Sequence, residues 1–179
     1  GLHILPTHRL VSAKTGVNLS GLLEALRRDF ELLELPEPVL PGPDERFGTF
    51  LLYADRRTWR VSLKESVRPE HIEPTRSAAW CRLDVSVLQK RVFESILGLT
   101  PEKLKGTELV DYSHDLSESV RWVDSGRFAL AFLMRTTPVQ AVAAVARNLE
   151  KLPPKSTYFY PKVPTGLVFR RLEDGEKWA

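Results

Sequence analysis

The sequence predicts a single α+β domain over residues 1–179, with a mixed, mostly antiparallel sheet and helices packed on it. Strand-like and helix-like segments alternate irregularly along the chain, as they do in this class. Two strand-like runs at 49–53 and 58–64 flank a short polar turn, and this hairpin pattern disfavours an all-parallel sheet. With 42% hydrophobic residues, the chain is long enough to bury one sizeable core.

The first elements are expected to be a strand and a helix. The stretch LHILPTHRLV at 2–11 is strand-like, and Pro6 favours a sheet edge or a bulge because proline cannot donate to the ladder. A helix is predicted over LLEALRRDFELL at 22–33, where apolar residues recur at helical spacing. Asn18 or Ser20 is suited to cap this helix, since their side chains accept hydrogen bonds from the first turn.

The middle of the chain is predicted to hold a loop and a second helix. The stretch PEPVLPGPDE at 36–45 contains four prolines, so we expect a loop there. A helix is predicted over 83–98, with Asp84 as the N-cap and Gly98 as the stop. Another short helical turn should begin at Pro101, because proline fits the first helical position.

A strand that leads into a helix is predicted around 108–115. Asp115 and Glu118 have the spacing of a capping box, in which the first side chain caps the helix and the second reaches back. The run RFALAFLMR at 127–135 is nearly continuously apolar, which is typical of a buried central strand.

The last third of the chain predicts one more helix and two strands. Thr137 and Pro138 have the pattern of a cap and a first helical residue before the helix expected at 139–150. Strands are predicted at 156–162 and 166–173, joined by a turn that contains proline and glycine.

Composition restricts the possible functions. The formal net charge is +3 and the pI is about 9.1, which is too weakly basic to indicate nucleic-acid binding without a basic face. The single cysteine, Cys81, forms neither an intramolecular disulfide nor a paired-cysteine metal site, and a reducing cytoplasm is the expected location. No run approaches the roughly 18 apolar residues of a membrane-spanning helix.

The most unusual stretch is PPKSTYFYPK at 153–162. In a strand, side chains alternate between faces, so Ser156, Tyr158, Tyr160 and Lys162 would share one face. A row with a hydroxyl, two phenols and an ammonium group could hold a phosphate or a carboxylate. The alternative is a half-buried edge strand with amphipathic tyrosines.

Two further stretches carry residues with possible chemistry. His8 and Arg9 are neighbours on the first predicted strand, so only one of them can face a given cleft. His8 is either a general base or phosphate ligand, or a structural histidine. In YSHD, His114 and Asp115 lie at a strand-to-helix junction, although Asp115 is more simply a helix cap.

Metal and nucleotide motifs are absent from the sequence. The four histidines lack the HxxxH and HExxH spacings, so no metal site is predicted. Neither a GxxxxGK[ST] loop nor a GxGxxG loop occurs, which disfavours P-loop and Rossmann nucleotide sites.

Three stretches together resemble a known family. LPTHRLV, YSHD and PPKSTYFYPKVPTGLVFRRL, in this order and spacing, resemble the C-terminal part of the prokaryotic domain-of-unknown-function family 1015. The resemblance implies a longer protein, whose N-terminal half carries an Asp-Gly-His-His-Arg motif similar to that of ParB-like domains. This sequence lacks that motif and starts at Gly1 in a strand-like stretch, so we expect it to be the C-terminal half.

The resemblance implies a function for the longer protein. ParB-like domains include free-serine kinases, so this chain would be the accessory half of a nucleotide-dependent phosphotransferase that acts on a small hydroxyl substrate. ATP or ADP with magnesium would bind to the full-length protein. The residues expected to contribute, with His8 in the catalytic role, are His8, Arg9, Lys155, Ser156, Tyr160 and Lys162.

A second function class stays open. The chain could be a non-catalytic regulatory domain that binds a small anion, a protein partner or its own N-terminal half. An exposed apolar patch would favour this alternative. Nucleic-acid binding rests on the pI alone and is disfavoured.

Overall fold

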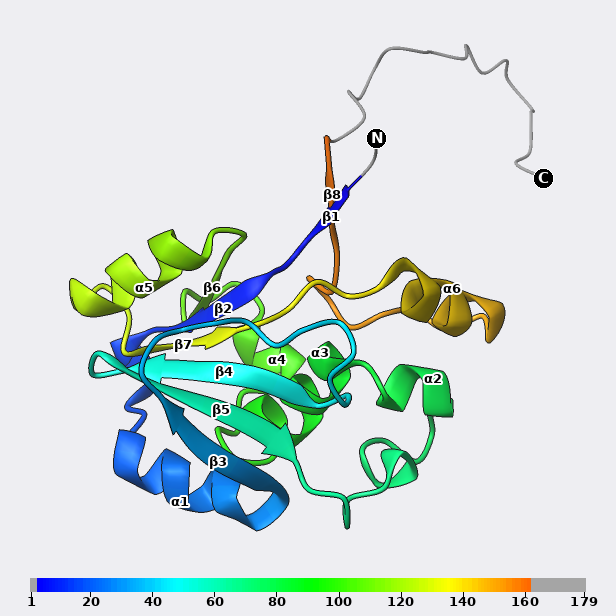
Figure 1. Ribbon diagram of the computed structural model, residues 1–179, viewed down its shortest axis with the longest axis horizontal. Coiled ribbons are helices and arrows are strands. Elements are labelled where there is room, and N and C mark those ends of the chain that lie inside the picture. The colour runs from blue at the N-terminus through cyan, green and yellow to red at the C-terminus, as the bar shows by residue number, and fades with distance from the viewer. Residues whose placement is uncertain (1–2, 162–179) are drawn as a thin grey trace.

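The computed structural model describes residues 3–161, so Lys162 and the strand expected at 166–173 lie outside the described residues. Its centre is a six-stranded sheet with the order β3-β5-β4-β7-β2-β6, in which every neighbouring pair is antiparallel (Figure 1). The strands are β2 (His8–Val11), β3 (Phe30–Leu35), β4 (Thr49–Ala54), β5 (Arg57–Leu63), β6 (Val110–Ser113) and β7 (Leu130–Leu133). The predicted α+β class is confirmed.

Helices flank this sheet. The α-helices are α1 (Leu19–Asp29), α2 (Ala78–Cys81), α3 (Asp84–Val87), α4 (Pro101–Leu104), α5 (Leu116–Asp124) and α6 (Val139–Arg147). A π-helical stretch, η3 (Leu88–Glu94), continues α3, and two 3-10 turns are η1 (Ala13–Thr15) and η2 (Pro69–His71). The caps predicted at Asn18 and Asp115 are confirmed, because their side chains accept from the backbone N–H groups of Gly21 and Glu118.

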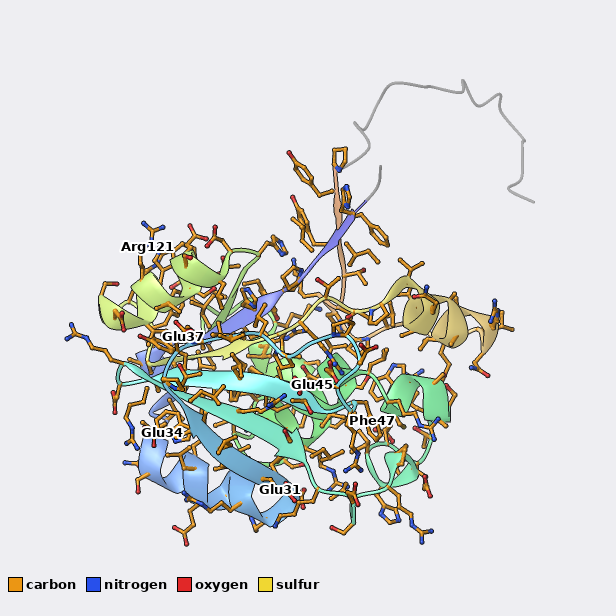
Figure 2. The ribbon with its side chains drawn as sticks, in the orientation of Figure 1. Glu31, Glu34, Glu37, Glu45, Phe47 and Arg121 are labelled. Atoms are coloured by element: carbon orange, nitrogen blue, oxygen red, sulfur yellow. The ribbon has the colours of Figure 1, made fainter. Side chains whose placement is uncertain are left out.

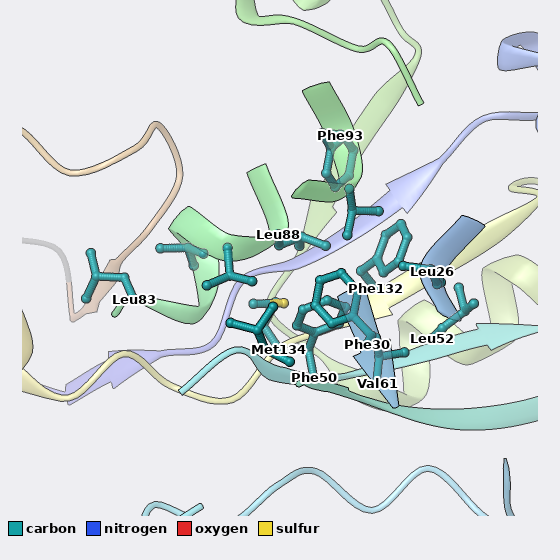
Figure 3. Packing of buried hydrophobic residues seen from close by; sticks show 14 of the residues in the cluster. Leu26, Phe30, Phe50, Leu52, Val61, Leu83, Leu88, Phe93, Phe132 and Met134 are labelled. Atoms are coloured by element: carbon teal, nitrogen blue, oxygen red, sulfur yellow. The ribbon is translucent and has the colours of Figure 1, made fainter. Parts of the chain in front are cut away.

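Both faces of the sheet are packed. On one face, Phe50 lies between Phe30 and Phe132 in edge-to-face contacts, with ring centroids 5.7 and 6.0 Å apart. Figure 3 shows this cluster, which also takes in residues of α1 and α3 such as Leu26. On the other face, Leu10 packs in a smaller cluster with residues of α5. The central strand β7 is completely buried between β4 and β2, as its apolar sequence predicts.

The first predicted strand is divided into two parts. Pro6 and Thr7 separate β1 (His3–Leu5) from β2, so the single strand expected over 2–11, with an edge or a bulge at Pro6, is two strands instead. β1 pairs antiparallel with β8 (Tyr158–Tyr160), and the two form a short arm that projects from the body (Figure 1). The strand predicted at 156–162 is therefore real but shorter, and it pairs with β1 instead of the large sheet.

The helix predicted over 22–33 ends earlier than expected. α1 stops at Asp29, and the chain continues directly into edge strand β3, which pairs with β5 from Phe30 opposite Leu63 to Leu35 opposite Thr58. Local helical periodicity extended through Phe30, but the strand pairing decides the conformation, since tertiary contacts override weak local preferences.

Two predicted caps are wrong. Asp84 is the first residue of α3, and its carboxylate instead accepts from the N–H of Gly48 and pairs with Arg135 at 2.7 Å. Thr137 donates its hydroxyl hydrogen to the carbonyl of Ser156, while Pro138 occupies the N-cap position of α6 without a side-chain cap. Both polar side chains tie distant segments together. None of the helices within residues 3–161 is long and apolar enough to span a membrane.

Candidate functional site

The three sequence stretches that carry the family resemblance meet at one end of the sheet. β2 pairs with the edge strand β6 so that Arg9 lies opposite Tyr112 and His8 lies opposite Ser113. The segment before β8 joins them, because Arg9 Nη2 donates a hydrogen bond of 3.2 Å to the backbone carbonyl of Lys155. Five side chains gather there, which we call the basic–aromatic cluster: Arg9, Tyr112, His114, Lys155 and Tyr158.

Arg9 is a buried cation within this cluster. Its side chain is largely inaccessible, with 5% of the residue exposed, and its Nη1 donates to the carbonyl of Thr7 at 2.7 Å. Burial lowers the pKa of Arg9 to about 10, and the neighbouring Tyr112 phenol opposes part of this shift. Arg9 still carries its charge at neutral pH. Within residues 3–161 it makes no ion pair with a carboxylate, which is unusual because buried charges are normally paired.

Lys155 brings a second positive charge to the cluster. Its ammonium group lies 5.6 Å from the centroid of the Tyr112 ring, within range of a cation–π interaction. Its backbone has φ of 58°, in the left-handed region that costs a non-glycine residue about 1–2 kcal/mol. The strained backbone directs the Lys155 carbonyl to Arg9 while its side chain covers Tyr112. Observed strain of this kind is a reason to look for a function.

His114 is fixed in both orientation and tautomer. Its Nδ1 lies 2.8 Å from the carbonyl oxygen of Pro6, and its ring lies on Tyr158 with centroids 3.9 Å apart. A carbonyl oxygen only accepts, so Nδ1 carries the proton of the neutral ring. Nε2 then keeps its lone pair, and no described residue forms a hydrogen bond with it. The Thr7 hydroxyl is a more distant neighbour, at 3.5 Å from Nδ1.

His8 faces away from the cluster. It is completely buried, and the backbone N–H of Met134 donates to its Nδ1 at 3.0 Å. Its Nε2 is also buried and has no hydrogen-bond partner in the described part of the chain. Burial is the main cause that lowers the pKa of His8 to about 4; electrostatic interactions with Arg9 and His114 lower it further, and Asp115 opposes the shift. His8 is therefore neutral and closed to solvent in this conformation, so its predicted catalytic role stays a prediction that the geometry does not favour.

The remaining candidates lie outside the cluster. Ser156 is buried, precedes β8 and donates its hydroxyl hydrogen to the carbonyl of Pro153, so it does not extend the row of tyrosines. Tyr160 lies at the end of the arm, opposite His3, and is 56% exposed. Asp115 caps α5 and is occupied in that role. Lys162 lies outside the described residues.

Other features of the described surface are separate from the cluster. A hollow of about 780 Å³ is lined by residues of β3 and β5, and one of about 670 Å³ lies at the start of α1. Figure 2 labels the acidic residues Glu31 and Glu34, which belong to β3, the edge strand at the opposite side of the sheet from β6. No group of histidine, cysteine and acidic residues that could hold a metal ion occurs between residues 3 and 161.

Tyr112 is the cluster residue to which the sequence assigned no ligand-binding role, whereas Tyr158 belonged to the predicted row of polar side chains at 156–162. Alternation along the strands gave the signal, since Tyr112 lies two residues before His114. The register that sets Tyr112 opposite Arg9 joins residues that are far apart in sequence, and it became visible only in the fold.

The fold and the cluster define an α+β domain with a buried cation, next to the edge strand β6, that has no carboxylate partner among residues 3–161. The model of a family described as "Protein of unknown function (DUF1015)" matches residues 1–86, and this match supports the membership of the chain in that family. The matched residues include LPTHRLV but end before YSHD. No curated protein matches the chain.

Solved structures share the fold at low sequence identity. A structure of "Free serine kinase in complex with AMP" has a TM-score of 0.51 at 12% identity and covers 88% of this chain. A conserved hypothetical protein from Pyrococcus furiosus has a TM-score of 0.52 at 11% identity and covers 92% of this chain. The chain spans 54% of the first of these proteins and 59% of the second.

Proposed function

We propose that this chain is the accessory half of a ParB-like, nucleotide-dependent phosphotransferase that acts on a small hydroxyl substrate such as free serine. The observation that carries the proposal is Arg9, a buried guanidinium group without a carboxylate partner in the described chain, beside the ammonium group of Lys155. The fold shared with a free serine kinase supports it. An N-terminal half of a longer protein would supply the remaining groups, including those for ATP or ADP and magnesium.

The cluster suits the physical demands of phosphoryl transfer. Such reactions need little covalent chemistry from the protein and depend on positive charge around the phosphate oxygens. Among residues 3–161, Arg9 donates two of its five N–H groups to backbone carbonyls, which leaves three for a ligand, and Lys155 adds three more donors. Two adjacent cations match the charge of a phosphate dianion better than that of a single carboxylate.

The proposal is tested by phosphoryl transfer in the full-length protein. Radiolabelled ATP, magnesium and free serine should give labelled phosphoserine, and Lys155→Gln should lower the turnover without lowering the melting temperature. Lys151→Gln is the matched control, since Lys151 is another exposed lysine four residues away. Equal activity of both variants, or a full-length protein without transfer activity towards hydroxyl compounds, would contradict the proposal.

A regulatory, non-catalytic binding domain is the second candidate function. The arm favours it, because Phe159 and Tyr160 expose 41% and 56% of their surface there. In that case, the chain would bind a small anion or its own N-terminal half without turnover. Anion binding that depends on Arg9, in a full-length protein that transfers no phosphate, would support this second function over the first.

A further inference from the structure

The cluster contains a histidine whose free nitrogen has no assigned role. We infer that His114, and not His8, contacts the ligand of the basic–aromatic cluster, and that its Nε2 accepts a hydrogen bond from a hydroxyl group of that ligand. The inference rests on the proposed function in one respect: the cluster must bind a small molecule that carries an anionic group and a hydroxyl group.

The tautomer of His114 gives the first argument. The Pro6 carbonyl at 2.8 Å holds the proton on Nδ1, so the neutral ring presents a lone pair at Nε2. A backbone carbonyl that accepts from one ring nitrogen is a common way in which proteins fix the other nitrogen of a functional histidine as the acceptor. His8 has the reverse arrangement. Its Nδ1 accepts from the backbone N–H of Met134, so its Nε2 carries the proton, and this N–H group is buried away from solvent.

The position of His114 gives the second argument. Residues two apart on a strand share a face, which places His114 on the side of Tyr112, and Tyr112 lies opposite Arg9. The contact between Thr7 and His114 shows that this alternation continues past the strand ends, since Thr7 lies two residues before Arg9. His8 and Ser113 occupy the opposite face. An anion bound by Arg9 and Lys155 would therefore have His114 as its neighbouring proton acceptor.

The ring of His114 is also held still. Tyr158 stacks on it with an interplanar angle of 32°, and this tyrosine comes from the same segment as Lys155. The two cations select a ligand with an anionic group, and the fixed Nε2 of His114 selects a ligand with a hydroxyl group at the right position. A ligand without that hydroxyl group would leave Nε2 without a hydrogen-bond donor, and its affinity would be lower. A small hydroxy acid or hydroxy amino acid fits this description.

Several charged and titratable groups lie on the elements that meet at His114. Arg9 and His8 come from β2, Tyr112 from β6, Asp115 follows His114 directly, and Lys155 and Tyr158 come from the last described segment. A bound dianion would add negative charge to this mainly cationic environment. This change in the surroundings of the His114 ring should appear in the chemical shifts of the ring.

Nuclear magnetic resonance of the histidine rings tests the inference on the 179-residue chain, with pyrophosphate as the probe. Signals are assigned with His114→Gln and His71→Gln, and His71 is the exposed control histidine. Saturating pyrophosphate should change the ring chemical shifts of His114 and leave those of His71 unchanged. Bound pyrophosphate without any response of the His114 signal would overturn the inference, as would the absence of binding.

A second experiment examines the hydroxyl group. The chain should bind serine about five- to tenfold more tightly than alanine, which lacks the hydroxyl group, and His114→Gln should reduce this preference while His71→Gln keeps it. An unchanged preference in His114→Gln would overturn the inference. These outcomes are independent of turnover, so loss of the proposed phosphotransferase activity alone would leave the inference standing.

Discussion

The guanidinium group of Arg9 donates a hydrogen bond of 3.2 Å to the backbone carbonyl of Lys155, which joins two cationic residues that are 146 positions apart in sequence. This contact links the start of the sheet to the segment before the arm. Both side chains adjoin Tyr112, and neither is neutralised by a carboxylate among the described residues. An anionic ligand would supply the missing charge.

The left-handed backbone of Lys155 predicts opposite effects on stability and binding. In Lys155→Gly, the strain at φ of 58° disappears, while the more flexible unfolded chain offsets part of the gain. The free energy of unfolding should be unchanged or rise by up to about 1 kcal/mol. Binding of pyrophosphate should weaken, because the ammonium group is lost. Urea unfolding and calorimetric titration of the same variant would measure both, and a clear loss of stability would count against the assigned strain.

His8 predicts a loss of stability in weak acid. Its folded pKa of about 4 lies below the ordinary value of 6.5, so the unfolded chain binds a proton between these values that the folded chain does not. The contribution to stability is fully present above pH 6.5 and is lost as the pH falls to about 4. Its size is about 3 kcal/mol, from about 1.4 kcal/mol for each unit of pKa shift.

Unfolding by urea at several pH values between 4 and 7 would measure this effect. His8→Asn keeps an acceptor for the Met134 N–H and should flatten the pH dependence. The exposed His71 offers the control, since His71→Asn should leave the pH dependence as it is in the wild type. A pH dependence that survives in His8→Asn would show that other groups cause it.

Arg135 predicts a large stability effect that is separate from ligand binding. Its Nε pairs with Asp84 at 2.7 Å, and its Nη1 donates to the carbonyls of Gly42 and Glu45, so it anchors the proline-rich loop to α3. Arg135→Ala would leave the largely buried Asp84 carboxylate unpaired and should cost about 3–5 kcal/mol. The free energy of unfolding of this variant, measured with urea, should fall by this amount. The pyrophosphate affinity of the folded fraction should stay near the wild-type value. A loss below 1 kcal/mol would contradict an anchoring role.

Sequence patterns predicted the fold class and most elements because the signals were local. The β4–β5 hairpin and the buried strand β7 follow directly from their local sequence patterns, whereas the strand expected over 2–11 is divided at Pro6 and Thr7. The sequence FELLEL after Asp29 became edge strand β3 although its periodicity continued the helix, because pairing with β5 is a long-range contact.

The site was predictable only in part. Alternation indicated that His8 and Arg9 face opposite sides, and the structure confirms this arrangement. The sequence did not show which of these two residues contacts Lys155. That contact depends on the register of β2 with β6 and on the position of the segment around residue 155, which packs against β2. The tautomer of His114 depended on the Pro6 carbonyl, which lies 108 positions away in sequence.

Isothermal titration calorimetry with pyrophosphate tests the anion site most directly. The wild-type chain should bind at about one site, and Arg9→Met and Lys155→Gln should each weaken binding about tenfold or more, since a charge-assisted hydrogen bond contributes about 1.5–3 kcal/mol. Lys151→Gln should bind like the wild type, and circular dichroism should show that each variant is folded. Equal affinities in all four proteins, or no binding by the wild type, would contradict an anion site at Arg9 and Lys155.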